Sequence, residues 1–381
     1  MARVLFHVQH LLGIGHLQRS RRIAEALAAV GIDVTLVHGG LPVPALHETR
    51  NIAVVQLPPI RARDATFALV NEAGAPIDDA LRAVRRAAVL AAFERAKPDA
   101  VIVEGFPFAR RAFRFELDPL IAAARGAGAP VICSVRDIPT VRPDPVRIAA
   151  IAARVRADFA AVLVHGDADF IRFDMAFPAA PQIADRLHYT GYVTADLLTA
   201  SDSDGCGEEG DGEILVSVGG GAAGRALLAA ALDARRAGCL AARGWRVLAG
   251  TSLVDEEFAA LCDAAPAGVV VERFRRDFPA LLRRCHVSVS QAGYNTVLDI
   301  LAARARAVLV PFAAERETEQ LVRAEHLAAR GAGLVVREGD LTAATLAAAI
   351  ELAAVMEPRG IALAADGARR SAALIAGLIA S

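Results

Sequence analysis

The sequence predicts an α/β protein built from two doubly wound domains, each a parallel sheet with helices on both faces. Short apolar runs alternate with Ala-, Leu- and Arg-rich segments of helical period, a pattern typical of strands that are buried on both sides. The same alternation returns in the second half of the chain. Between the halves lies an acidic, Gly- and Ser-rich tract, residues 199–212, which cannot contribute to a hydrophobic core.

The elements follow in order along the chain. In the first half the expected strands are residues 4–8, 34–38, 54–57, 100–104, 131–135 and 161–165, and the expected helices are residues 20–30, 79–96, 117–125 and 146–157. In the second half the expected strands are residues 213–218, 246–249, 269–271, 287–290, 307–310 and 334–336. We therefore expect an N-terminal domain of residues 1–198, a linker of residues 199–212 and a C-terminal domain of residues 213–381, whose last helix can cross back to the N-terminal domain.

Composition and charge exclude several classes of protein. The 381 residues include 42 basic and 43 acidic ones, a balance that argues against a nucleic-acid partner. The five cysteines form no C-x-x-C pair, so neither a zinc site nor a disulfide framework is expected, and reduced thiols indicate the cytoplasm. No apolar run approaches the ~20 residues of a membrane span, and the N-terminal run is too short for a signal peptide.

Ligands of such sheets bind beyond the carboxyl ends of the strands, so the loops there are candidate sites. The first loop, residues 9–20, carries Gly13 and Gly15, which permit a tight turn and close approach to a ligand. His16 stands where the next helix is expected to begin. It is a candidate general base near neutral pH, although a helix-capping histidine explains it equally well.

The second loop follows the first strand of the C-terminal domain. Gly219, Gly220 and Gly221 expose backbone amides, and a helix beginning near residue 226 adds its positive end. Three consecutive glycines are more than an ordinary turn requires, so the loop favours diphosphate binding over a simple turn.

The third region comprises residues 290–301 and 311–320. After a strand, Gly293 turns the chain into a helix that carries Asp299 one turn in, where a carboxylate can accept hydrogen bonds from both hydroxyls of a ribose. The loop after the next strand is expected to bring Glu319 and Gln320 to the same place. The alternative is a solvated helix with scattered acidic residues.

Other polar residues offer further candidates. Glu104 and Asp137 each follow an N-terminal strand, and either is an alternative to His16 as the base or a structural helix cap. Asp202 and Asp204 resemble a metal-binding Asp-x-Asp pair but lie in the linker, so no metal site is expected. The Phe- and Arg-rich segment 106–115 suits an anionic lipid or polyanionic acceptor, or the start of a helix packed on the core. Arg82, Arg85 and Arg86 suit a membrane-facing or a solvated helix face.

Together these regions resemble the glycosyltransferases of the GT-B fold, and most closely family 28, typified by the N-acetylglucosaminyltransferase that makes the lipid-linked peptidoglycan precursor. That family carries Ser-Gly-x-x-Thr-x-x-Glu at a helix start, then Pro-Phe, then Gln-Gln. The matching residues here are Ala292, Gly293, Thr296 and Asp299, then Pro311 and Phe312, then Glu319 and Gln320. The resemblance implies that Asp299 grips the donor ribose and Gln320 contacts the sugar, while Glu319 in place of glutamine leaves the sugar open.

The resemblance extends to three further segments. The family's Gly-Gly-Ser diphosphate loop is matched by Gly219, Gly220 and Gly221 without the serine hydroxyl. The segment against the uracil is matched by Phe274 and Arg275, and the N-terminal Gly-rich loop by Gly13, Gly15 and His16.

This resemblance implies an inverting transfer of N-acetylglucosamine or a related hexose from a UDP-sugar to an acceptor hydroxyl, without a metal or other cofactor. The acceptor is not readable from the sequence. A lipid-linked acceptor and a peripheral place at the membrane, in cell-envelope or glycoconjugate synthesis, fit the family. Residues 13–19 also resemble the loop of a UDP-sugar hydrolase of nonulosonic acid biosynthesis, so water is an alternative acceptor activated by His16. A non-catalytic subunit that only binds the nucleotide sugar is the remaining alternative.

Overall fold

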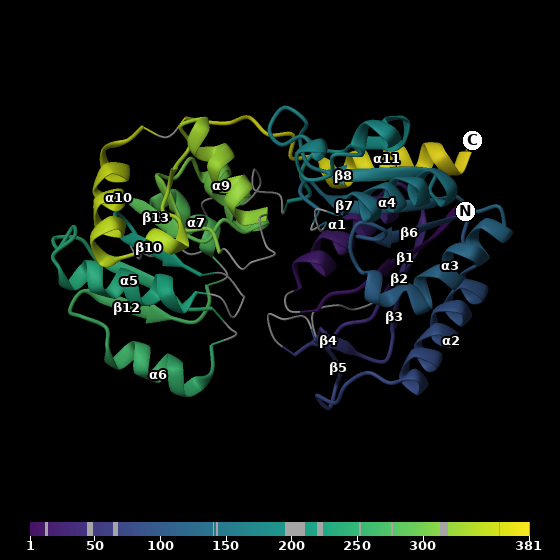
Figure 1. Cartoon of the computed structure of the whole chain (residues 1–381), viewed down its shortest axis with the longest axis horizontal. Coiled ribbons are helices and arrows are strands. Elements are labelled where there is room, and N and C mark those ends of the chain that lie inside the picture. Colours follow the sequence, from purple (N-terminus) through teal and green to yellow (C-terminus); the bar gives the residue numbers. More distant parts are fainter. Residues whose placement is uncertain are drawn as a thin grey trace. The chain divides into compact units, whose positions relative to one another are not determined.

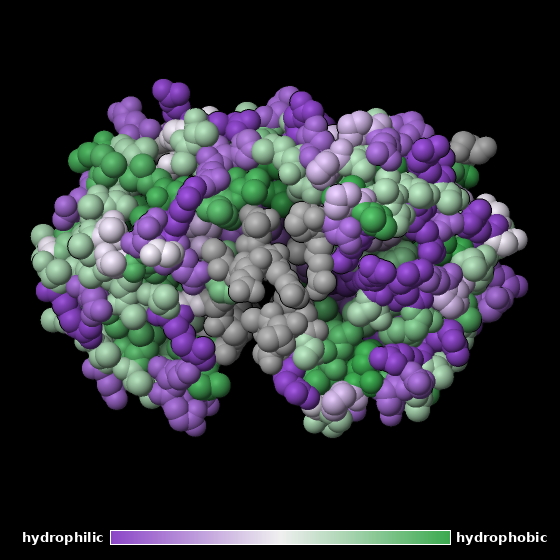
Figure 2. Space-filling model, in the orientation of Figure 1, coloured by the Kyte–Doolittle hydropathy of each residue, from purple (hydrophilic) through white to green (hydrophobic). Residues whose placement is uncertain are grey.

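The computed structural model describes residues 1–11, 14–43, 49–63, 68–139, 141, 144–194, 210–218, 224–250, 253–275, 277–312, 319–357 and 359–380. The chain divides into two compact units (Figure 1), one formed by Met1–Ala195 with Leu363–Ser381 and the other by Asp196–Ala362. Each unit has a parallel sheet with helices, so the predicted α/β class is confirmed. Figure 2 shows hydrophilic and hydrophobic residues interspersed over the visible face of each unit.

In the first unit, seven of the described strands form one parallel sheet in the order β3-β2-β1-β6-β7-β8-β9. Their bounds are β1 Arg3–Val8, β2 Asp33–His38, β3 Ile52–Gln56, β6 Ala100–Glu104, β7 Val131–Arg136, β8 Ala161–His165 and β9 Leu187–Tyr189. A small antiparallel pair, β4 Ile60–Ala62 with β5 Leu69–Asn71, lies outside this sheet. The sequence did not predict β4, β5 or β9, because runs of three residues are too short to show a period.

The helices of this unit cover the two faces of the sheet. They are α1 Gly15–Ala29, α2 Asp79–Ala96, α3 Arg114–Gly126, α4 Pro145–Asp158 and α11 Gly367–Ala380, with short 3-10 turns η1 Arg111–Phe113, η2 Phe173–Met175 and η3 Ala180–Arg186. Alternate residues of the strands face opposite sides. Thus Leu5 packs in one apolar cluster with α2, α3 and α4, and Phe6 packs in another with α1 and α11.

The C-terminal helix belongs to the first unit, the arrangement that the sequence left open. The yellow α11 in Figure 1 packs on α1, and Val193 forms a β-bridge with Asp366 just before the helix begins. Gly367 permits this contact, because a Cβ there would lie 2.3 Å from the carbonyl oxygen of Gly191.

A buried ion pair joins α2 and α3 in the first unit. Arg85 donates from Nε and Nη2 to the two carboxylate oxygens of Glu116 at 2.7 and 2.6 Å, and both side chains have no exposed surface. The guanidinium also donates to Gln9 Oε1 and to the carbonyl oxygens of Gly39 and Pro58. The prediction that Arg85 lies on a solvated or membrane-facing helix face is therefore wrong, because its hydrogen-bond partners are inside the domain.

In the second unit, six of the described strands form a parallel sheet in the order β12-β11-β10-β13-β14-β15. The strands are β10 Ile214–Ser217, β11 Trp245–Leu248, β12 Val269–Glu272, β13 Val287–Ser290, β14 Ala307–Leu309 and β15 Leu334–Val335. The helices are α5 Arg225–Arg236, α6 Asp255–Asp263, α7 Phe278–Arg284, α8 Tyr294–Ala303, α9 Glu319–Ala329 and α10 Ala343–Val355, with the 3-10 turn η4 Glu338–Asp340. Helices α5 and α10 pack together against one face of the sheet.

Candidate functional site

In the first unit, a histidine and a glutamate meet at the carboxyl end of the sheet. Helix α1 begins at Gly15, five residues before the predicted start, so His16 lies in its first turn. Glu104 is the last residue of β6, which pairs with β1. His16 Nδ1 lies 2.7 Å from Glu104 Oε1, and the two side chains are 23% and 1% exposed. The structure thus brings together two of the three residues predicted as candidate bases.

Two arginines that the sequence did not predict surround this pair. Arg19, one turn after His16 on α1, donates from Nη2 to Glu104 Oε1 at 2.6 Å. Arg110 Nε lies 3.9 Å from Glu104 Oε2. The four-residue group His16, Arg19, Glu104 and Arg110 is called the dyad cluster below. A sequence signal existed for Arg19 in its i,i+3 spacing from His16.

The charges of the dyad cluster determine its protonation. Burial lowers the pKa of His16 to about 4, an effect that the positive charges of Arg110 and Arg136 reinforce and Glu104 opposes. Burial alone would raise the pKa of Glu104, but His16, Arg19 and Arg110 together hold it well below its usual range. At neutral pH Glu104 is therefore ionised and His16 is neutral.

This protonation state fixes the tautomer of His16. An ionised carboxylate only accepts hydrogen bonds. Nδ1 of His16 therefore carries the proton and donates a hydrogen bond to Glu104. The lone pair is then on Nε2, which has no hydrogen-bond partner in the part of the chain that the structure describes. The imidazole is partly exposed and oriented by its carboxylate, an arrangement that suits a general base.

Asp137, the third candidate base, is held differently. Its carboxylate has no exposed surface, accepts a hydrogen bond from the hydroxyl of Tyr192 at 3.0 Å and another from the backbone N–H of Ile138 at 2.9 Å. A Cβ at Gly166 would lie 2.6 Å from the Cβ of Asp137. These contacts indicate a residue that joins the end of β7 to the segment after β9, and we do not assign the base to it.

A buried polar chain also runs beside the dyad cluster. Ser134, opposite Glu104 in the β6–β7 register, has its hydroxyl 2.7 Å from His165 Nε2, and His165 Nδ1 lies 2.9 Å from Thr190 Oγ1. Burial lowers the pKa of His165 well below its usual value, so this histidine is neutral. The sequence analysis missed this chain because Ser134, His165 and Thr190 are far apart in the sequence and only the β7–β8–β9 pairing brings them together.

In the second unit, the predicted ribose-binding segment forms a strand, a short turn and a helix. Ala292 is buried, and Gly293 is the N-cap of α8, with φ −63° and ψ 152°. Glycine has no side chain to cap the first N–H groups of the helix, which leaves these donors for a ligand. Thr296 and Asp299 are half-buried on α8, one turn apart. The segment thus has the local form that the sequence predicted.

Glu319 and Gln320, at the start of α9, make contacts within the unit. Glu319 accepts a hydrogen bond from Arg323 Nη2 at 3.0 Å, and both side chains are buried. Arg323 Nη1 also donates to the carbonyl oxygen of Ala292, and the guanidinium lies over the ring of Tyr294. Arg323 therefore ties α9 to the start of α8. The sequence analysis missed it, although its i,i+4 spacing from Glu319 is visible.

Gln320 is the second residue of α9. Its Oε1 accepts a hydrogen bond from the backbone N–H of Phe312 at 3.1 Å. The amide nitrogen is thereby oriented by the loop that follows β14, while the Pro-Phe segment is held to α9.

The remaining predicted residues are less closely grouped. Phe274, after β12, is 63% exposed. Arg275 donates from Nε and Nη2 to both oxygens of Asp277 and from Nη1 to Glu272. Strands β11 and β10 separate β12 from β13. Gly15 begins α1, whereas Gly13, Gly219, Gly220 and Gly221 lie outside the described residues, so their assignment stays a prediction.

Comparison with known proteins supports the resemblance predicted from the motifs. Residues 215–376 match the family model described as glycosyltransferase family 28 C-terminal domain. The UDP-N-acetylglucosamine--N-acetylmuramyl-(pentapeptide) pyrophosphoryl-undecaprenol N-acetylglucosamine transferase of Methylobacterium radiotolerans is 36% identical over 103 residues, which are 27% of this chain and 28% of the relative. The same-named protein of Rhodopseudomonas palustris (strain BisA53) is 29% identical over 194 residues, or 50% of this chain and 51% of the relative. The chain thus matches at most about half the length of these two relatives.

Solved structures extend the fold comparison to the whole chain. The glycosyltransferase of kitacinnamycin has a TM-score of 0.63 at 17% identity, covering 100% of this chain and 95% of that one. MurG of Acinetobacter baumannii has a TM-score of 0.58 at 17% identity, covering 100% of both chains. The chain therefore has the GT-B fold, and its residues 215–376 resemble the C-terminal domain of glycosyltransferase family 28. The fold and the family resemblance predicted from the sequence are therefore confirmed.

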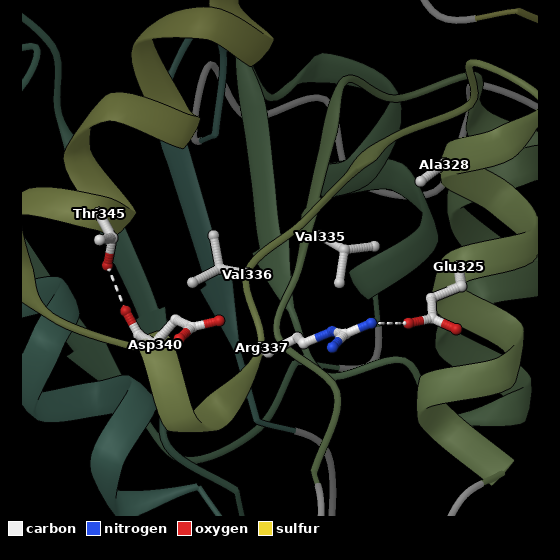
Figure 3. A pocket seen from close by; sticks show the side chains of 7 residues that line it. All are labelled: Glu325, Ala328, Val335, Val336, Arg337, Asp340 and Thr345. Carbon is white, nitrogen blue, oxygen red and sulfur yellow. Dashed lines mark hydrogen bonds and ion pairs between the residues drawn. The ribbon is translucent and has the colours of Figure 1, made fainter.

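A cavity of about 410 Å³ in the second unit of this GT-B protein lies apart from all the predicted residues. Figure 3 shows it between α9, β15, η4 and α10. Arg337 Nη2 donates to Glu325 Oε1 at 2.6 Å, and Thr345 Oγ1 donates to the carbonyl oxygen of Asp340 at 2.7 Å. The guanidinium of Arg337 in this cavity is therefore already paired with the carboxylate of Glu325.

No group of His, Cys, Asp or Glu residues suited to a metal ion occurs among the described residues. No helix among the described residues is long and apolar enough to cross a membrane.

Proposed function

We propose that this protein is an inverting glycosyltransferase that moves a sugar from a UDP-sugar to an acceptor hydroxyl. The observation that carries the proposal is the oriented His16–Glu104 pair, in a chain whose second unit matches the family 28 C-terminal domain. A neutral imidazole whose Nε2 carries a lone pair is the group that such a reaction needs, and the match to a glycosyltransferase domain supports a donor site on the second unit.

The proposed reaction is a single displacement at the anomeric carbon of the donor sugar. His16 Nε2 takes the proton of the acceptor hydroxyl while the acceptor oxygen attacks the anomeric carbon from the face opposite UDP. The bond between that carbon and the β-phosphate oxygen breaks, and UDP leaves with the electron pair. Glu104 stabilises the imidazolium that forms, and solvent finally receives the proton.

The donor is proposed to bind on the second unit. The first N–H groups of α8 and the Gly219–Gly221 loop hold the diphosphate, so that no divalent ion is required. Asp299 accepts from the ribose hydroxyls, Phe274 offers an exposed ring to the uracil and Gln320 contacts the sugar. The Glu319–Arg323 pair supports this site by holding the carbonyl of Ala292.

The two relatives named above suggest the substrates. Their names specify UDP-N-acetylglucosamine as the donor and a pyrophosphoryl-undecaprenol derivative as the acceptor. By similarity we propose N-acetylglucosamine or a related hexose, a lipid-linked acceptor, and a cytoplasmic protein that contacts the membrane peripherally.

Hydrolysis of the UDP-sugar is a second candidate function. The observation in its favour is the 23% exposure of the His16 side chain, because a partly exposed imidazole can contact water as well as an acceptor alcohol. The same two residues would then activate water.

Release of UDP from UDP-N-acetylglucosamine and other UDP-sugars, measured in EDTA with and without a lipid-linked acceptor extract, tests these functions. Acceptor-dependent release that is lost in His16→Ala and kept in His188→Ala supports transfer. His188, half-buried on β9, is the matched control. Release that needs no acceptor indicates hydrolysis, and absence of both activities from protein that binds UDP indicates a non-catalytic binding subunit.

A further inference from the structure

Arg19 is a buried arginine on the first helix of the first unit. Its side chain is 4% exposed, and an arginine is rarely buried to that extent unless it has a partner. The neighbouring residues Leu17 and Ile23 of α1 belong to an apolar core cluster, which fixes the rotation of the helix about its axis. The burial of Arg19 therefore follows from the packing of α1, and its guanidinium requires a specific partner inside the unit.

The partner is the carboxylate of the dyad cluster. Arg19 Nη2 donates to Glu104 Oε1 at 2.6 Å, and His16 Nδ1 lies 2.7 Å from the same oxygen. Nη2 and Nδ1 are 3.4 Å apart. A carboxylate oxygen has two lone pairs and can accept both hydrogen bonds. Arg19 and His16, one turn apart on α1, are thus held by one oxygen atom of Glu104.

Arg110 has a different relation to this carboxylate. It follows two buried phenylalanines, Phe106 and Phe108, of the Phe- and Arg-rich segment. Its Nε lies 3.9 Å from Glu104 Oε2, which is longer than the about 2.7–3.2 Å of an N–H···O hydrogen bond. Arg110 therefore adds positive charge beside Glu104, whereas Arg19 also fixes the position of the oxygen that His16 contacts.

We propose that Arg19 is a positioning residue for the base. Its hydrogen bond holds Glu104 Oε1 where this oxygen accepts from His16 Nδ1, and its charge keeps the carboxylate ionised, so that the lone pair of His16 stays on Nε2. Charge-assisted hydrogen bonds of this kind are short and strong. The proposal rests on the proposed function, because Arg19 takes part in the same proton transfer, acting through Glu104.

Arg19 also affects how the His16–Glu104 pair takes up a proton. Burial alone would raise the pKa of Glu104, and the charges of His16, Arg19 and Arg110 lower it. Without Arg19, a proton added to the pair meets one positive charge fewer, whichever of the two side chains holds it. The apparent pKa of the pair therefore rises when Arg19 is neutralised.

Further titratable and charged groups surround the pair. They are Arg110 after β6, Arg136 and Cys133 on β7, His165 at the end of β8 and His10 after β1. Burial raises the pKa of the Cys133 thiol and lowers the pKa of both histidines, so these three groups are neutral at neutral pH. The two arginines are charged in wild type and in every Arg19 variant, so a change in the apparent pKa of the pair reports the loss of the Arg19 charge.

Substitutions of Arg19 that remove or keep its charge test the proposal. Arg19→Gln and Arg19→Met both remove the charge, so the test stands if one of them does not fold, and Arg19→Lys keeps a charge and a donor. Arg125→Gln is the control. Arg125 is exposed in the last turn of α3, which leads into the start of β7, so its ion pair with Asp158 lies at the opposite end of the sheet from the dyad cluster.

Two measurements follow the variants. Initial rates of UDP release give kcat, KM and the pH dependence of kcat/KM. NMR of isotope-labelled histidine gives the apparent pKa of His16 without turnover, and the signal of His16 is the one that is absent from His16→Ala. Circular dichroism establishes that each variant is folded across the pH range.

We expect Arg19→Gln to lower kcat by about tenfold or more while the KM for the UDP-sugar is unchanged. The apparent pKa of the pair, and with it the acidic limb of kcat/KM, should rise by about one pH unit. Arg19→Lys should keep the acidic limb of wild type and recover most of kcat, and Arg125→Gln should match wild type. A role of Arg19 in stability alone would lower the unfolding temperature and leave both pKa readouts unchanged.

A folded neutral variant with the kcat of wild type, or with the wild-type pKa of His16, would overturn the proposal. An Arg19→Lys protein that behaves like Arg19→Gln would overturn it as well, because the charge would then have no effect. A wild-type protein that releases no UDP contradicts the proposed function instead, and the NMR titration still decides whether Arg19 controls the pair.

Discussion

Glu104→Gln is the substitution that most sharply tests the role of the dyad cluster. Glutamine has nearly the same shape and can still accept the Nδ1–H of His16, so it removes the charge and leaves the hydrogen bond possible. His16 then faces Arg19, Arg110 and Arg136 without the one group that raises its pKa. The pKa of His16 falls further, and the imidazolium formed during proton transfer loses its counter-charge.

The size of the effect follows from the geometry. Charges about 4 Å apart interact by about 4 kcal/mol at an effective dielectric constant of about 20, and positioned general bases contribute about 10²–10⁴-fold to a rate. Since the hydrogen bond is retained, we expect kcat/KM to fall by about 10²–10³-fold, or about 3–4 kcal/mol. UDP affinity should be unchanged, because the proposed nucleotide site is on the second unit.

Initial rates of UDP release measure this loss, with calorimetric UDP binding as the check that the second unit is intact. Arg19 and Arg110 lose a buried carboxylate, so unfolding must be followed by circular dichroism; a folded state weakened by about 3–5 kcal/mol is expected. His16→Ala and the double variant His16→Ala/Glu104→Gln complete a cycle. A pair that acts as one unit gives a double variant no slower than His16→Ala. A folded Glu104→Gln protein within fivefold of wild type would refute the reasoning.

Three further predictions concern protonation and the buried ion pair. The acidic limb of kcat/KM should lie near pH 4, because the pKa of His16 is lowered to about 4 in the folded protein; a limb near 6.5 would remove His16 from the base role. Burial, and secondarily the charge of His10, also lowers the pKa of His38 to about 4. Between pH 6.5 and 4 the unfolded chain therefore binds more protons than the folded one at His16 and His38. Urea unfolding should show stability falling as pH drops through this window, by on the order of 3 kcal/mol for each histidine at the lower end, and pH-independent unfolding would contradict this. Arg85→Met should destabilise the protein by about 3–5 kcal/mol in the same assay, since the buried Glu116 carboxylate loses its guanidinium partner and keeps only the contact with His7 Nε2 at 3.2 Å. Arg85→Met/Glu116→Leu should recover part of that loss, and a double variant less stable than Arg85→Met would show that the pair is not the cause.

The sequence predicted the secondary structure well where the hydrophobic pattern of a segment was unambiguous. Strands β6, β8 and β13 have the predicted bounds. Strands β6 and β8 are apolar runs that end at a polar residue, and β13 alternates valine with serine. The start of α1 was placed five residues too late, because glycine is a poor helix former and Gly15 suggested a loop. A first turn tolerates glycine better than a helix interior does, since its N–H groups need no partner within the helix.

The candidate site was only partly predictable, because burial of a charge depends on partners that are remote in the sequence. Glu104 and His16 were recognised from the loops that follow strands, but nothing in the sequence linked Arg19 or Arg110 to Glu104, because the contacts of both arginines with its carboxylate depend on the folded structure. Glu319 was expected to lie beside Gln320 in the donor site, and in the structure its carboxylate pairs with Arg323, one turn along the same helix.

Metal-free titration of the protein with UDP, comparing wild type with Asp299→Ala, tests the proposed donor site most directly. Asp263→Ala, on exposed surface at the end of α6, is the control. We predict that UDP binds wild type and the control in EDTA, and that Asp299→Ala weakens binding by at least tenfold because the ribose loses its acceptor. If UDP does not bind, or binds Asp299→Ala as tightly as wild type, the proposed donor site is contradicted and only the family resemblance and the fold remain.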